Sequence, residues 1–288
     1  MFLYRLLKTP FFGKYRKPWI FPEVENARDW QRLTLQSDSN ACLAALFGPS
    51  TVQPVVGNVL LAHPMGKDAK GFFLRDGHAR FLRENGFNVL LFDFNGFGES
   101  QEGSFSYVED VLAAGRELRR LAPDLPTAVV GTSFGGAWAI CALSRKGHGF
   151  SAAVIEGAFT TLKEFWYRYP VANLVLSALS MLLPKLERSL RPIVQIRSIE
   201  GLRRILFIYG ESDRAAPVEM GKRLHEACNL PESDRFFWKL PESGHTQAFM
   251  RASLTCRMRY VDFLRESFTA LALNDLTVPS SGRADARR

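Results

Sequence analysis

The sequence predicts an α/β protein with a mostly parallel central sheet covered by helices on both faces. Short apolar runs, typical of strands buried on both faces, alternate with helical segments along the 288-residue chain. Most runs end in turns rich in Gly, Pro, Asn or Asp, as expected where strands pass into loops. The 47% hydrophobic content and the length fit one large globular domain and exclude a disordered chain.

Strands and helices are expected in a regular order. The first two strands form a pair, and the later ones are continuous apolar runs. Strands are predicted at residues 32–36, 41–47, 55–62, 87–94, 127–131, 152–156, 205–209 and 235–240. Helices are predicted at about 68–85, 107–121, 134–146 and 217–228, and from about 247 onward.

The chain divides into four parts. Residues 1–30 form an N-terminal arm rich in basic and aromatic residues, 31–275 the main domain, and 276–288 a tail expected to be disordered. Within the domain, residues 158–200 interrupt the alternation after the sixth strand and are predicted to form a small cap. The cap contains an uncharged stretch, 171–183, which is too short to span a bilayer and is expected to be buried or to face something apolar.

The net charge of +8 is unevenly distributed. Basic residues are concentrated in the arm, at 185–204 and at 280–288, and the remainder of the chain is slightly acidic. This distribution and the lack of a recognisable module argue against nucleic-acid binding. Basic and aromatic residues mixed in the arm predict peripheral contact with an anionic membrane, with packing of the arm on the domain as the alternative.

The four cysteines have no spacing typical of disulfides or metal ligands, which favours a reducing, cytoplasmic location, with peripheral contact at the inner membrane face as a further possibility. We expect no metal and no cofactor. No signal peptide and no membrane-spanning segment are predicted.

A candidate nucleophile lies between the fifth strand and the helix that follows it. The segment Gly131-Thr132-Ser133-Phe134-Gly135 matches G-x-S-x-G in the strand–turn–helix setting of a nucleophile elbow. Gly131 and Gly135 provide the small residues that such a tight turn requires. The alternative is an inert serine at a glycine-rich junction.

A serine hydroxyl needs a base, which is usually a histidine oriented by a carboxylate. His245 follows the last strand and Asp213 follows the seventh, so both are expected near Ser133 at one edge of the sheet. Glu156 and then Glu211 are the alternative acids. The order Ser, Asp, His along the chain is the order found in hydrolases with this elbow.

Acyl transfer also needs donors for the oxyanion. One candidate is the backbone N–H of Phe134. The other is the N–H of Met65, because Pro64 before it has none. We expect His63 to hold this loop in shape.

Residues 31–270 resemble the α/β-hydrolase superfamily, and more narrowly the ABHD-type acyl hydrolases and the serine aminopeptidase S33 domain. The matching motifs are HPMG (63–66), DFNGFGES (93–100), GTSFGG (131–136), GESDRAAP (210–217) and SGH (243–245). The chain has Pro64 where the family usually has Gly and Asn95 where it usually has Arg. The resemblance implies an α/β-hydrolase fold with a cap after the sixth strand and a Ser133–Asp213–His245 triad, but it does not identify a substrate.

The predicted function is hydrolysis of carboxylic esters, including lipid or other acyl-chain esters, through an acyl-enzyme. In the cap, positions 174, 178 and 182 (Leu174, Ala178 and Leu182) are candidates to contact an apolar substrate, and simple packing on the body is the alternative. Thioester or peptide hydrolysis on the same residues, and non-catalytic binding on the same fold, are the other interpretations.

Overall fold

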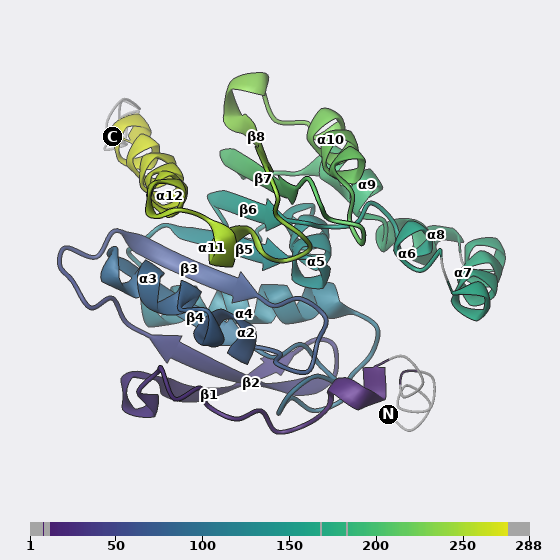
Figure 1. The fold of residues 1–288 in the computed structure, drawn as a ribbon, viewed down its shortest axis with the longest axis horizontal. Coiled ribbons are helices and arrows are strands. Elements are labelled where there is room, and N and C mark those ends of the chain that lie inside the picture. Colours follow the sequence, from purple (N-terminus) through teal and green to yellow (C-terminus); the bar gives the residue numbers. More distant parts are fainter. Residues whose placement is uncertain (1–7, 9–11, 168, 183, 276–288) are drawn as a thin grey trace, which may run out of the picture.

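The computed structural model describes residues 8, 12–167, 169–182 and 184–275. Its strands form one sheet in the order β1-β2-β4-β3-β5-β6-β7-β8 (Figure 1). β2 runs antiparallel to β1 and β4, and the other neighbouring strands are parallel. The strands are β1 Gln31–Ser37, β2 Ala41–Gly48, β3 Gly57–Ala62, β4 Phe87–Phe92, β5 Thr127–Thr132, β6 Ala152–Glu156, β7 Arg204–Gly210 and β8 Arg235–Leu240. The predicted α/β class with a mostly parallel sheet is confirmed.

Helices cover both faces of the sheet, and each face has its own apolar core. One core includes residues of α4, α5 and α10, and the other includes residues of α2, α3, α11 and α12. The helices are α2 Gly71–Arg75, α3 His78–Glu84, α4 Tyr107–Leu121, α5 Phe134–Leu143, α6 Leu162–Phe165, α7 Pro170–Leu182, α8 Pro184–Ser189, α9 Pro192–Gln195, α10 Val218–Ala227, α11 Ala248–Arg251 and α12 Leu254–Asp275. Short 3₁₀ helices lie at Gly13–Tyr15, Ala27–Asp29, Ile196–Ser198 and Glu232–Asp234.

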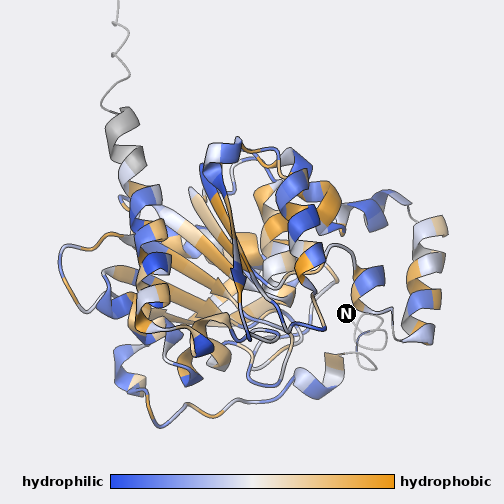
Figure 2. Cartoon of the chain, turned by 45° about the horizontal axis from the view of Figure 1, so that its top comes forward, coloured by the Kyte–Doolittle hydropathy of each residue, from blue (hydrophilic) through white to orange (hydrophobic). Residues whose placement is uncertain are grey.

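The apolar runs become the central strands because only a two-sided core can cover them. Every residue of β3, β4, β5 and β6 is buried. Figure 2 shows hydrophobic residues concentrated on the strands, with hydrophilic residues on the outer sides of the helices that flank them. The loops that follow these strands therefore start from a closely packed layer.

Two predicted helices are divided in the structure. The helix expected at 68–85 forms α2 and α3, separated at Gly77, which has a φ of 69°. A glycine in the left-handed region ends one helix and lets the chain start the next. The helix expected from residue 247 forms α11 and α12, with an extended Ala252 between them.

The described part of the N-terminal arm packs on the domain. The Lys8 ammonium is buried and donates hydrogen bonds to the Asn95 side chain and, at 2.6 Å, to the Ser104 carbonyl. Burial lowers the pKa of Lys8 to about 8. The Phe12 ring lies 6.1 Å from that of Phe134. These contacts match the packing alternative, whereas residues 1–7, 9–11 and the predicted tail 276–288 lie outside the described residues.

Between β6 and β7 the chain forms α6, α7, α8 and α9, at the position where the cap was expected. Figures 1 and 2 both show α7 at the periphery of the molecule, with α6 and α8 beside it. Among the described residues, no helix combines the length and the hydropathy needed to cross a bilayer.

Candidate active site

Ser133 occupies a strained turn between β5 and α5. Its φ is 52°, in the left-handed region that residues with a side chain rarely adopt. A Cβ on Gly131 would lie 2.6 Å from the Cα of Gly136, and a Cβ on Gly135 would lie 2.0 Å from the Ala62 carbonyl oxygen. A side chain at either position would overlap backbone, which explains the glycines on both sides of the serine.

The structure brings Ser133, His245 and Asp213 together. The Ser133 Oγ lies 2.8 Å from the His245 Nε2, and the His245 Nδ1 lies 2.7 Å from the Asp213 Oδ2. These residues come from the loops after β5, β8 and β7, whose carboxyl ends meet at the same edge of the sheet. Because the ionised carboxylate can only accept a hydrogen bond, the imidazole donates through Nδ1 and offers its Nε2 lone pair to the serine hydroxyl.

The Asp213 carboxylate is held on both oxygens. Its Oδ1 accepts hydrogen bonds from the N–H groups of Ala215 at 2.8 Å and Ala216 at 2.9 Å. Gly157, which the sequence analysis did not single out, makes room beside it. A Cβ on Gly157 would lie 3.3 Å from the Asp213 Oδ2 and 3.5 Å from the His245 Nδ1, and its φ is 55°. Its position directly after the sixth strand, at the same edge of the sheet as Ser133, could have indicated this role from the sequence.

Two backbone amides lie free in the loops beside Ser133. Within the described ranges, neither the N–H of Met65 nor that of Phe134 donates to another protein group. Phe134 is the first residue of α5, so its N–H lies at the positive end of the helix dipole. The His63 Nδ1 lies 2.7 Å from the Pro64 carbonyl oxygen, and the His63 Nε2 accepts a hydrogen bond from the Phe94 N–H at 3.1 Å. Burial lowers the pKa of His63 to about 4, so a neutral ring holds the loop.

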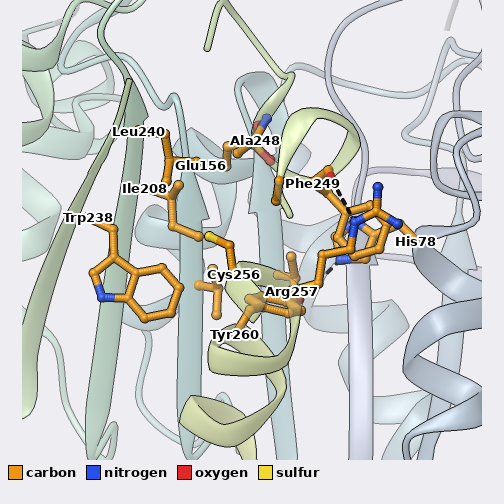
Figure 3. Close-up of a pocket in the computed structure, with 13 residues that line it drawn as sticks. His78, Glu156, Ile208, Trp238, Leu240, Ala248, Phe249, Cys256, Arg257 and Tyr260 are labelled. Atoms are coloured by element: carbon orange, nitrogen blue, oxygen red, sulfur yellow. Dashed lines mark hydrogen bonds between the residues drawn. The ribbon is translucent and has the colours of Figure 1, made fainter. Parts of the chain in front are cut away.

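Neither alternative acid is the hydrogen-bond partner of the imidazole. The Glu156 Oε1 accepts a hydrogen bond from the Ala248 N–H at 2.9 Å (Figure 3), and burial raises the pKa of Glu156. This side chain lines a cavity of about 30 Å³ between the sheet and α11–α12, which has room for water but not for an organic ligand. Glu211 is paired with Lys239 at 2.6 Å. The imidazole is therefore bonded to Asp213.

The cap residues expected to contact substrate are exposed. Leu174 is 72% exposed and Leu182 77%, and Ala178 between them is exposed as well. The described residues of this apolar stretch are therefore not buried within the chain, which leaves the other expectation, that they face something apolar. In the structure, α7 lies beside α6 and α8 at the periphery of the molecule (Figure 1).

No group of three or more His, Cys, Asp or Glu side chains in the described part of the chain is arranged to hold a metal ion. The sheet order, the strained serine and its hydrogen-bonded histidine together define a serine hydrolase of the α/β-hydrolase superfamily.

Comparison with known proteins agrees with this class. The family model for serine aminopeptidase, S33, matches residues 53–205, and the chain belongs to this family. The chain is 25% identical over 257 residues to the uncharacterized protein YfhR of Escherichia coli K12, covering 86% of this chain and 81% of YfhR. It is 26% identical over 159 residues to human protein ABHD12B, covering 51% of this chain and 43% of that protein.

Two solved structures are similar in fold. The Pyrococcus furiosus esterase Pf2001 superposes with a TM-score of 0.69 at 18% identity, covering 88% of this chain and all of the esterase chain. The Pyrococcus horikoshii acylaminoacyl peptidase superposes with a TM-score of 0.60 at 13% identity, covering 83% of this chain and 41% of the peptidase. Both superpositions agree with the α/β-hydrolase fold of this chain.

Proposed function

We propose that this protein hydrolyses carboxylic esters through a Ser133–His245–Asp213 triad and an acyl-enzyme. The observation that carries the proposal is the continuous hydrogen-bonded series from the Ser133 Oγ through the imidazole to the Asp213 carboxylate. In the same small region, the two amides beside the serine are available to an oxyanion.

Each residue has a defined role in the proposed reaction. The Ser133 oxygen attacks the ester carbonyl while the His245 Nε2 takes its proton, and Asp213 stabilises the imidazolium that forms. The N–H groups of Met65 and Phe134 bind the developing oxyanion. The imidazolium then protonates the departing alkoxide. Water, deprotonated by the same imidazole, releases the acid and restores the serine.

We infer that the acyl group is apolar, as in a lipid or other acyl-chain ester. Phe134, beside the nucleophile, is surrounded by the rings of Phe94, Phe97 and Tyr107 at 5.0–5.4 Å between centroids. The half-buried Met65 packs against the same cluster. Apolar surroundings favour an apolar acyl group because binding removes its surface from water. We place this chemistry in the cytoplasm, supported by four cysteines that are all unpaired.

A fluorophosphonate probe and a series of p-nitrophenyl esters test the proposal. The wild-type protein is expected to be labelled, Ser133→Ala to be unlabelled, and the cap variant Ser180→Ala to be labelled normally. Labelling that persists in folded Ser133→Ala, or its absence from the wild type, would favour a non-catalytic protein. Faster cleavage of acetate than of octanoate would contradict an acyl-chain substrate. Faster cleavage of the matching thioester or peptide amide would reassign the bond.

A further inference from the structure

Helix α7 has the opposite polarity to an ordinary surface helix. Five of its large apolar residues are 53–83% exposed, and with Ala178 they form one stripe at 3.6 residues per turn. The stripe consists of Val171, Leu174, Val175, Ala178, Met181 and Leu182. The other side of the helix carries the half-buried Asn173, Leu176, Ser177 and Ser180, three of which are polar. A surface helix of a globular protein normally turns its apolar side inward and its polar side to water.

Hydrogen bonds account for the polar residues on the inner side. The Asn173 amide donates to the Trp166 carbonyl at 3.0 Å, and the Ser180 hydroxyl donates to the Leu176 carbonyl at 2.9 Å. The Asn173 bond joins α7 to the end of α6, the Ser180 bond lies within α7, and the apolar stripe faces outward. A contiguous apolar surface of this kind marks a site of interaction.

The charge beside the stripe identifies the partner. Lys185 and Arg188 of α8 are exposed and, within the described ranges, have no carboxylate partner. The neighbouring acids Glu164 and Glu187 are both neutralised in ion pairs, with Arg223 and Arg191. The surface around the stripe is therefore positive, and it requires a partner that is both apolar and anionic.

We propose that the apolar stripe of α7, flanked by Lys185 and Arg188, docks the protein on an anionic phospholipid bilayer. A second copy of the chain is disfavoured, because the surface around its own stripe is also positive and offers Lys185 and Arg188 no anionic partner. Exposed Tyr167 and Tyr169 at the start of the helix suit the headgroup level, where a ring can be apolar on one side and wet on the other. With 13 residues, α7 lies in the interface and does not span it.

Vesicle flotation with the full-length protein tests this docking. The wild type is expected to float with vesicles of phosphatidylcholine and phosphatidylserine, to bind vesicles of phosphatidylcholine alone at least about tenfold more weakly, and to be released by salt. Lys185→Gln/Arg188→Gln should weaken binding to the anionic vesicles on the order of 10- to 30-fold. Leu174→Gln/Leu182→Gln should weaken binding to a similar extent.

Two control variants carry the same chemical changes elsewhere. Arg145→Gln/Lys146→Gln removes two exposed cations after α5, and Ile20→Gln/Val24→Gln removes two exposed apolar side chains from the arm. Both should bind within about twofold of the wild type.

Three outcomes would overturn the proposal. They are wild-type protein that does not float with anionic vesicles, binding that is lost equally in the controls, and a lipid-free dimer that depends on Leu174 and Leu182. Lys185→Gln/Arg188→Gln should still cleave a soluble short-chain ester. Loss of vesicle binding with retained cleavage separates docking from the proposed catalysis.

Discussion

The loops around Ser133 and the cap helix α7 differ in how their side chains are surrounded. At the serine, buried backbone and side chains hold each functional group: Asp213 by two N–H groups, His245 by Asp213, and the serine turn by glycines that leave no spare room. In α7, large apolar side chains are open to solvent. The proposed chemistry therefore lies in the body of the domain, and the proposed contact with lipid lies in the cap.

The greatest loss of activity is expected at Ser133, in the body of the domain. Ser133→Ala should lower kcat/KM for a p-nitrophenyl ester by about 10⁴- to 10⁶-fold, because the nucleophile is removed. Ser180→Ala, a serine of the cap, should stay within about twofold. Steady-state kinetics on both variants, with circular dichroism to verify folding, provides the measurement. Similar losses of kcat/KM in the two variants would contradict the proposal that the chemistry depends on Ser133.

Backbone packing in the body gives the next effect. Gly135→Ala should destabilise the fold by about 3 kcal/mol or more, because the new Cβ would overlap the Ala62 carbonyl oxygen. Gly66→Ala, where a Cβ would meet nothing within 4 Å, is the matched substitution and should change stability by less than about 1 kcal/mol. Urea unfolding of both variants measures the difference in their unfolding midpoints. Equal midpoints would show that the elbow has more room than the structure indicates.

Desolvation in the body predicts a dependence on pH. Burial lowers the pKa of His63 from 6.5 to about 4, so between these pH values the unfolded chain is protonated at this ring and the folded chain is not. The contribution of the neutral ring to the free energy of unfolding is complete above pH 6.5. It falls by about 3 kcal/mol in all as the pH drops toward 4. His63→Gln should therefore show a flatter fall in stability over this range. Unfolding curves with unchanged slope in the variant would contradict the desolvated ring.

The smallest expected effect lies in the cap. Leu182→Ala should alter the free energy of unfolding by less than about 0.5 kcal/mol, because this side chain is 77% exposed. Leu206→Ala, at a fully buried position of β7, should cost about 2–5 kcal/mol. Thermal unfolding of the two variants measures the contrast. A large loss from Leu182→Ala would mean that the cap packs against the body in solution.

The features that depend on local sequence pattern could be predicted before the structure was known. The alternation of apolar runs and helical segments predicts the sheet, because a strand covered on both faces must be apolar throughout. The elbow motif and the loop positions of Asp213 and His245 predict which side chains meet, since parallel strands deliver their following loops to one edge. The helix breaks at Gly77 and Ala252 were missed, because apolar periodicity continues across both.

The surroundings of each functional group, in contrast, depend on contacts between distant parts of the chain. Glu156 and Asp213 both follow buried strands, and their neighbours in space direct one to the Ala248 amide and the other to the imidazole. The apolar stretch 171–183 was expected to be buried or to face something apolar, and five of the large apolar side chains of α7 are exposed in the structure. Hydropathy predicts that burial of an apolar segment is favourable. Whether the segment is buried within its own chain depends on contacts with residues distant in the sequence.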